Sequence, residues 1–153
     1  MKSLEEALDC NDEDIILEGF MNRYDVSKEE AQEIFHETKK WLWLAALSDK
    51  EKNHNMFIDE PLLIIDEMWH TFILYTRSYY NFCINKFNKI LHHQPNSKIK
   101  GSKIVTELPS QKELKLRKQF NLIYDYLGPD TLVKWYETMP QRYTSEYIRS
   151  IRK

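Results

Sequence analysis

Along the chain, stretches in which apolar residues recur every three or four positions are separated by short polar segments. This spacing places apolar side chains on one face of an α-helix. It occurs over residues 12–24, 27–47, 61–86, 111–127 and 129–139. Residues 144–153 add either a short basic helical turn or a frayed end. The pattern therefore predicts an all-α fold, a single compact domain of five or six helices over residues 1–153, in which residues 1–11 fray and 92–110 form a long loop.

Two helix starts carry recognisable signals. Ser27 precedes Glu30 by three residues, the spacing of a capping box. From there a stripe of buried positions runs to about Leu47. Its members are Ala31, Ile34, Phe35, Thr38, Trp41, Leu42 and Ala45. Pro61 suits the first turn of the next helix, because its missing N–H has no intrahelical partner there.

Residues 61–86 predict one long, aromatic-rich central helix. With 100° between successive residues, one broad apolar face collects Met68, Trp69, Phe72, Tyr75, Thr76, Tyr79, Tyr80 and Cys83. The other side carries Asp66 and His70, together with Arg77, Asn81 and Asn88. Asn88 also marks the expected end, because asparagine tolerates the left-handed backbone of helix termini. Most of the rings are thereby assigned to packing.

The segment that follows is the best loop candidate in the chain. Residues 91–103, "LHHQPNSKIKGSK", are polar and contain proline and glycine. A short β-hairpin around Ile104 and Val105 is the alternative to an irregular loop.

Composition narrows the class of protein. Hydrophobic residues make up 42% and charged residues 30% of 153 residues, which is typical of a soluble globular chain, and only 3 glycines favour helices over a turn-rich sandwich. A net charge of −2 gives no global attraction to nucleic acid or an anionic membrane. The basic residues between 98 and 118 are expected to form a solvated surface.

The expected location is the cytoplasm. The N-terminal residues are too acidic for a signal peptide, and no apolar run approaches membrane length. Cys10 and Cys83 lie far apart without a CxxC spacing, so reduced thiols are the simplest account.

Several strings resemble the glycine-rich domain-containing protein-like family and its compact bacterial relatives. They are "HETKKWLWL", "IDEMWHTFILYTRSYYNFC", "LHHQP" and "YDYLGPDTLVKWYETMPQRY", and the similarity spans about residues 14–143. The DEMWHTF…FC…HHxP string is the specific part. Relatives commonly read Trp-His-Thr-His, whereas this chain has Phe72 at the second histidine position, as compact bacterial members do. The resemblance implies a fold and a place for a site, and it supplies no activity.

Asp66 and His70 are the first candidate site. Four residues apart, they share one helix face and could bind a metal ion such as zinc, or the carboxylate could orient the imidazole as a base. Glu37, beside the buried stripe of the preceding helix, is the expected third ligand. An Asp–His pair on a solvated helix face is the alternative interpretation.

Cys83, His92 and His93 form a second candidate cluster. On an unbroken helix a residue at position 92 would lie roughly 33 Å from His70, so the sequence predicts two separate places and no shared ion. The alternative interpretation makes Cys83 a small hydrophobe of the core and gives the histidine pair a structural role in holding the loop.

Two functional classes remain open. The first is a small interaction or regulatory module that binds a protein partner through exposed aromatic or basic residues. The alternative is a metal-dependent enzyme, possibly a hydrolase, centred on Asp66 and His70, with an open metal position that activates water. The sequence favours the module, because it contains no phosphate-binding glycine loop, HExxH or GxSxG motif to designate a reaction.

Overall fold

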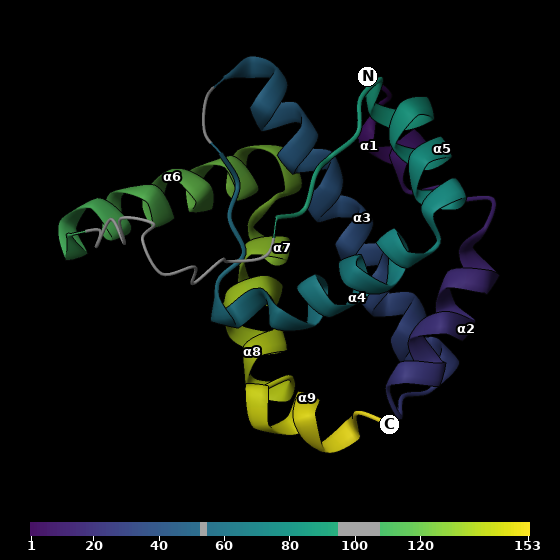
Figure 1. The fold of residues 1–153 in the computed structure, drawn as a ribbon. Helices are drawn as coiled ribbons and strands as arrows, with labels where there is room; N and C mark the ends of the chain where they lie inside the picture. Colours follow the sequence, from purple (N-terminus) through teal and green to yellow (C-terminus); the bar gives the residue numbers. More distant parts are fainter. Residues whose placement is uncertain (53–54, 95–107) are drawn as a thin grey trace, which may run out of the picture.

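α3 (Lys28–Glu51) is the central helix of the computed structural model, which describes residues 1–52, 55–94 and 108–153. The helix begins where the sequence predicts: the Ser27 hydroxyl accepts a hydrogen bond from the Glu30 amide at 3.1 Å. It runs four residues past the expected end at Leu47 and stops at Lys52, whose φ of 53° is left-handed. α3 contacts α1 (Leu4–Ala7), α2 (Glu13–Arg23), α4 (Leu63–Leu74) and α6 (Pro109–Leu127), which surround it in Figure 1.

The remaining elements are also helical. They are η1 (Glu60–Leu62), α5 (Thr76–Phe87), α7 (Pro129–Val133), the π-helical turn η2 (Lys134–Thr138), α8 (Met139–Arg142) and α9 (Ser145–Ile151). Across the described residues no β-strand occurs, only one isolated bridge between Tyr24 and Arg152. The predicted all-α class is therefore confirmed, with more helical segments than the five or six expected. The alternative hairpin at Ile104 and Val105 lies outside the described residues.

The N- and C-terminal residues are both tied to the body of the molecule. Ser3 and Glu6 cap α1 reciprocally, and Ala7 is completely buried, although residues 1–11 were expected to fray. At the other end the Lys153 amide donates to the Arg23 carbonyl oxygen at 2.9 Å, which holds the chain end beside α2 (Figure 1). Among the described helices, none has both the length and the apolar character needed to cross a membrane.

The predicted long helix over residues 61–86 is wrong, because it breaks at Tyr75. α4 ends at Leu74, Tyr75 has the non-helical angles φ −87° and ψ 66°, and α5 begins at Thr76. Packing explains the break: the buried Phe72 ring meets the ring of Tyr79 edge-on at 5.1 Å and that of Phe82 at 5.3 Å. The aromatic faces of the two helices thus close on each other, which a straight rod would prevent.

Gly19 of α2 makes room for the residue at the break. A Cβ added there would lie 2.3 Å from the Tyr75 hydroxyl and 2.6 Å from a ring carbon. The Tyr75 ring therefore lies directly on the α2 backbone.

Gly19→Ala is expected to destabilise the chain by about 1–2 kcal/mol, since the overlap with the Tyr75 ring should outweigh the gain in helix propensity of about 1 kcal/mol. In a Tyr75→Ala background the same substitution should become neutral or stabilising. Urea unfolding of the four proteins of this double-mutant cycle measures the coupling. Equal effects of Gly19→Ala in both backgrounds would contradict the contact.

α5 ends as predicted at Asn88, whose φ of 60° is left-handed. Residues 89–94 then run back toward α4, as the extended segment in Figure 1 shows. The Tyr79 hydroxyl donates to the Leu91 carbonyl oxygen at 2.5 Å and fixes the course of this segment. The break at Tyr75 and the reversal at Asn88 together bring residues 92 and 93 back to α4.

Candidate metal centre

Asp66, His70 and His93, here called the triad, meet beside the middle turns of α4. His93 Nε2 lies 2.8 Å from Asp66 Oδ1, and His70 Nε2 lies 3.5 Å from Asp66 Oδ2. One potential ligand atom from each residue lies within 4.8 Å of the other two. Asp66 and His70 share a helix face because they are one turn apart, whereas His93 arrives from the segment after α5. Two imidazoles therefore point the same type of nitrogen at the two oxygens of one carboxylate.

Ring stacking fixes the orientation of His93. Its ring lies between those of Trp69, at a centroid distance of 4.2 Å, and His70, at 4.5 Å, with interplanar angles of 23° and 19°. Trp69 is itself held, because its indole N–H donates to the Tyr79 hydroxyl at 3.0 Å. Tyr79 also bonds Leu91, so one α5 side chain positions both the stacking partner and the segment that carries His93.

Glu67 lies on the other side of His70. Its Oε2 is 3.9 Å from His70 Nδ1 and 3.7 Å from the Arg23 guanidinium, and the Tyr24 hydroxyl donates a hydrogen bond to it. Burial, together with this bond, raises the pKa of Tyr24 to about 12, so the phenol remains a donor. His70 thus has a carboxylate near each ring nitrogen. A carboxylate behind the non-ligating nitrogen is the arrangement that orients metal-binding imidazoles.

The triad forms part of the wall of a cavity of about 460 Å³, here called the triad cavity. Its lining residues come from α3, α4 and the two segments that flank α4. They are Trp41, Met56, Phe57, Ile58, Leu63, Asp66, Trp69, His70, His92, His93 and Gln94. An ion held by the triad would therefore have a side that faces a partly open pocket instead of a packed core.

The structure places Glu37 away from the triad. Its side chain is 3% exposed, and it accepts a hydrogen bond from the Trp135 indole N–H at 2.6 Å and pairs with Lys40 at 3.1 Å and Lys134 at 3.2 Å. Burial alone would raise the pKa of Glu37, but Lys40, the indole N–H and Lys134 together lower it below its usual value. Glu37 therefore joins α3 to η2, and it is not among the groups that converge around Asp66.

The second predicted cluster is divided. Cys83 is completely buried next to the Tyr79 hydroxyl and the Leu91 backbone, and burial raises the pKa of its thiol. His92 lines the triad cavity without joining the triad. His93 belongs with Asp66 and His70, and the predicted separation of the two sites is wrong because it assumed an unbroken helix. The sequence signal available for this juxtaposition was the histidine pair itself, and it did not distinguish His93 from His92.

A family model described as UCP032817-like matches residues 13–125, which covers most of the chain and all three triad residues. The resemblance to the glycine-rich domain-containing protein-like family is therefore corrected. Neither a curated protein nor a solved structure matches the chain. By this match the chain belongs to the UCP032817-like family, a name that states no activity.

Proposed function

We propose that this member of the UCP032817-like family is a metal-dependent enzyme that binds one divalent transition-metal ion through Asp66, His70 and His93. The observation that supports this most strongly is the convergence of two imidazole Nε2 atoms on one carboxylate at the wall of a cavity. Three protein ligands with a further position open to solvent or substrate are typical of catalytic metal sites, whereas structural zinc sites are closed by four ligands.

The donor set suits particular ions. Two imidazoles and one carboxylate are used by hydrolytic zinc enzymes and by non-haem iron(II) oxygenases. With bonds of about 2.0–2.2 Å to one ion, ligand atoms lie roughly 3–4 Å apart. The present spread of up to 4.8 Å therefore has to close only slightly, by rotation of His70 or Asp66. An ion would replace the direct contact between His93 and Asp66.

The open metal position would polarise an oxygen atom. A bound water loses its proton more readily on zinc, and a bound carbonyl becomes more electrophilic. Glu67, held by Tyr24, lies 3.9 Å from His70 Nδ1, and a hydrogen bond formed there by a small rotation would keep His70 in the tautomer that presents Nε2 to the ion. In this arrangement the triad would hold the ion, Glu67 would orient His70, and the reactive oxygen atom would lie at the cavity wall.

Metal titration of chelator-stripped protein tests the proposal. We expect one Zn²⁺ or Co²⁺ ion to bind per chain. When the free ion concentration is a hundred times the Kd, binding contributes about 2.7 kcal/mol to the free energy of unfolding. The melting temperature should then rise by about 5–10 °C. Asp66→Asn should lose both effects. If neither ion binds, or if Asp66→Asn binds equally well, the Asp66–His93 contact is a structural hydrogen bond and the proposal fails.

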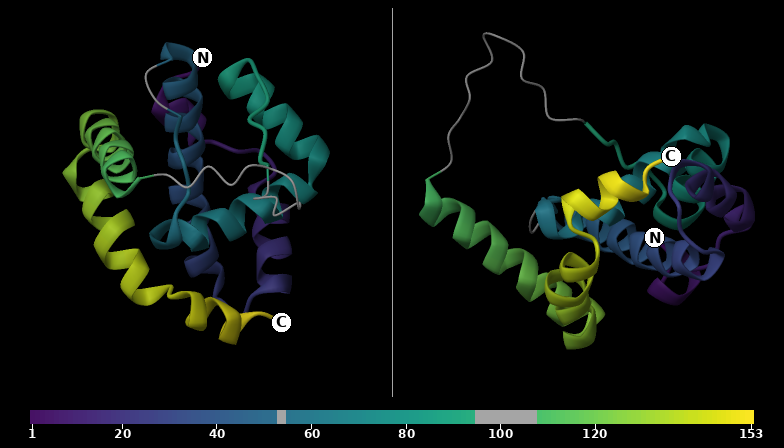
Figure 2. Two further views of the ribbon diagram at one scale, coloured as in Figure 1. Left: turned by 60° about the vertical axis from the view of Figure 1, so that its left-hand side comes forward. Right: turned by 90° about the horizontal axis from the view of Figure 1, so that it is seen from below.

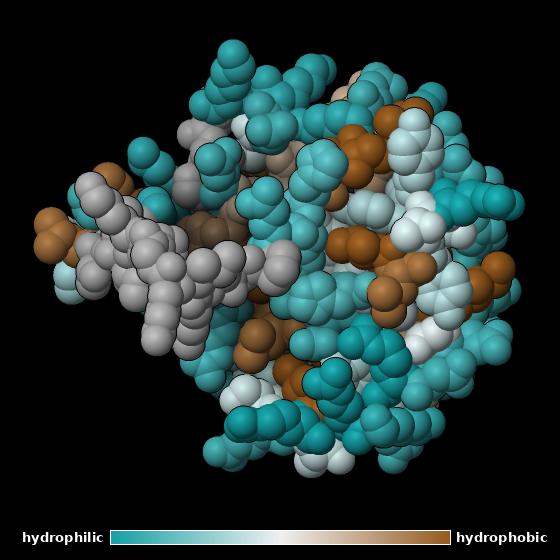
Figure 3. All heavy atoms as spheres, viewed as in Figure 1, coloured by the Kyte–Doolittle hydropathy of each residue, from teal (hydrophilic) through white to brown (hydrophobic). Residues whose placement is uncertain are grey.

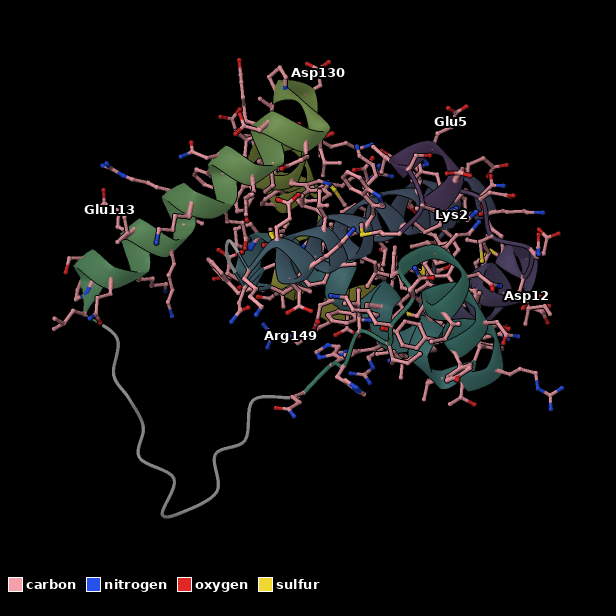
Figure 4. The ribbon with its side chains drawn as sticks, turned by 90° about the horizontal axis from the view of Figure 1, so that it is seen from above. Lys2, Glu5, Asp12, Glu113, Asp130 and Arg149 are labelled. Carbon is pink, nitrogen blue, oxygen red and sulfur yellow. The ribbon has the colours of Figure 1, made fainter. Side chains whose placement is uncertain are left out.

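A protein-binding role is the second candidate, and α6 supports it. The N-terminal half of α6 extends away from the remaining helices (Figures 2 and 4, where Glu113 marks it). Leu108 and Leu114 are exposed there at 60% and 55%. On the face seen in Figure 3, hydrophobic residues lie scattered among hydrophilic ones. Loss of a co-purifying protein in a Lys112→Glu, Lys118→Glu variant would support this role, and unchanged co-purification would oppose it.

A further inference from the structure

We infer that the triad cavity accepts a small acyl compound, a carboxylate or hydroxamate whose oxygen atoms bind the metal and whose flat apolar body lies against Trp41 and Trp69. The inference rests on the proposed metal site and adds the chemical class of its ligand. Three features of the cavity carry it: the mixture of polar and apolar residues in its lining, its charge, and an unpaired indole N–H.

The lining of the cavity contains both polar and apolar residues. The triad, His92 and Gln94 supply the polar part of the lining. The rest is predominantly apolar and consists of Trp41, Met56, Phe57, Ile58, Leu63 and Trp69. The rings of Trp41 and Trp69 lie 5.0 Å apart at 45°, and both contribute to the wall. Such a surface favours an aromatic or otherwise flat apolar group next to the metal-binding end.

A second cavity of about 300 Å³ adjoins the first. The two share Trp41, Met56, Trp69 and His92 as lining residues. The other lining residues of the second cavity are Ala45, Asp49, Asn55, Ile90 and Leu91, and Asp49 is paired with Lys89. A ligand body longer than one ring can therefore extend past the tryptophans. The triad cavity alone is within the range of about 300–1,000 Å³ that accommodates small organic ligands.

The described lining of the cavity favours a ligand with a single negative charge. Among its lining residues in the described part of the chain, Asp66 is the only carboxylate and there is no lysine or arginine. A divalent ion with Asp66 leaves one net positive charge, which matches a single carboxylate or hydroxamate. Phosphate groups are usually bound by several arginine or lysine donors, which the described lining residues do not supply.

Trp41 supplies a donor for the ligand's second oxygen. Trp41 is 3% exposed, and its indole N–H is buried without a hydrogen-bond partner among the described residues. Buried donors are nearly always paired, and an unpaired one costs about 1–3 kcal/mol. Because the ring lines both cavities, a small rotation on ligand binding presents this N–H to an acyl oxygen.

The test uses the Co²⁺-loaded full chain, whose visible spectrum reports ligands that bind the ion. Benzohydroxamate is expected to bind at least tenfold more tightly than acetohydroxamate, because its ring is removed from water against the tryptophans. Inorganic phosphate should leave the spectrum unchanged at the same concentrations. Trp41→Phe keeps a ring and removes the N–H, so it should weaken benzohydroxamate binding about 3- to 10-fold at unchanged cobalt stoichiometry.

Trp43→Phe is the matched control, because Trp43 lies on the same helix and donates to the Lys2 carbonyl oxygen, away from both cavities. It should leave benzohydroxamate affinity unchanged. Equal affinity for the two hydroxamates, or tighter phosphate binding, would overturn the ligand class even if Trp41→Phe did not fold. Unchanged affinity in folded Trp41→Phe would overturn the role of the indole. Absence of bound cobalt would instead overturn the metal site, and the inference with it.

Discussion

His93→Ala should weaken Zn²⁺ or Co²⁺ binding by more than about 100-fold, since it removes a direct ligand and even the loss of an outer partner commonly costs 10- to 100-fold. His92→Ala should change the Kd by less than about threefold. The two histidines are adjacent in sequence and both line the triad cavity, but only His93 contacts Asp66. Comparing the His93→Ala and His92→Ala variants therefore distinguishes the loss of a metal ligand from the general effect of removing an imidazole from the cavity wall.

Isothermal titration of chelator-stripped variants measures this difference, with circular dichroism as the check that each variant is folded. If His92→Ala and His93→Ala lose affinity equally, the arrangement of the triad is wrong. If neither loses affinity, the ion binds elsewhere.

Phe72→Ala should lower the free energy of unfolding by about 3–5 kcal/mol, the usual cost of removing a fully buried phenylalanine. Phe72 is completely buried and meets three rings edge-on, those of Phe35, Tyr79 and Phe82. The resulting space lies at the junction of α3, α4 and α5, where those rings cannot close without moving a helix. The free energy of unfolding of a typical domain is about 5–15 kcal/mol, so the loss expected for Phe72→Ala is a large fraction of it.

Urea unfolding at neutral pH measures the change, and Leu74→Ala is its control. Leu74 lies two residues away on the same helix but is 69% exposed, so its removal should cost less than about 0.5 kcal/mol. Similar costs for the two substitutions would show that the ring cluster does not hold α4 against α5.

Local signals predicted the helix boundaries well where a side chain or a backbone preference sets them. Ser27 caps α3 and Asn88 ends α5 in the left-handed conformation, as expected from their chemistry. The apolar periodicity also placed Phe72, Tyr79 and Cys83 in the core correctly. These features depend on neighbours within a few positions, and a single sequence contains that information.

The break at Tyr75 could not be read in the same way. No proline or glycine marks it, and the residues on both sides continue an acceptable helical pattern. It depends on contacts between residues distant in sequence, with the Tyr75 ring lying on Gly19 and Phe72 meeting Phe35. The position of His93 follows from this break, so the error about one helix became an error about the site.

Glu37 illustrates a different limit. Its place near a buried stripe was predictable, since it is 2% exposed on α3. Its partners were not, because Lys134 and Trp135 come from η2, almost a hundred residues later. Sequence reasoning assigned a buried carboxylate to a metal ion, whereas the structure gives it two lysines and an indole.

Anomalous diffraction from a crystal of the Zn²⁺-loaded chain tests the metal site most directly. A single peak within about 2.0–2.2 Å of Asp66, His70 Nε2 and His93 Nε2, with its remaining side facing the triad cavity, is the predicted result. An intact hydrogen bond between Asp66 and His93 in zinc-saturated crystals, with the ion elsewhere or absent, would contradict it.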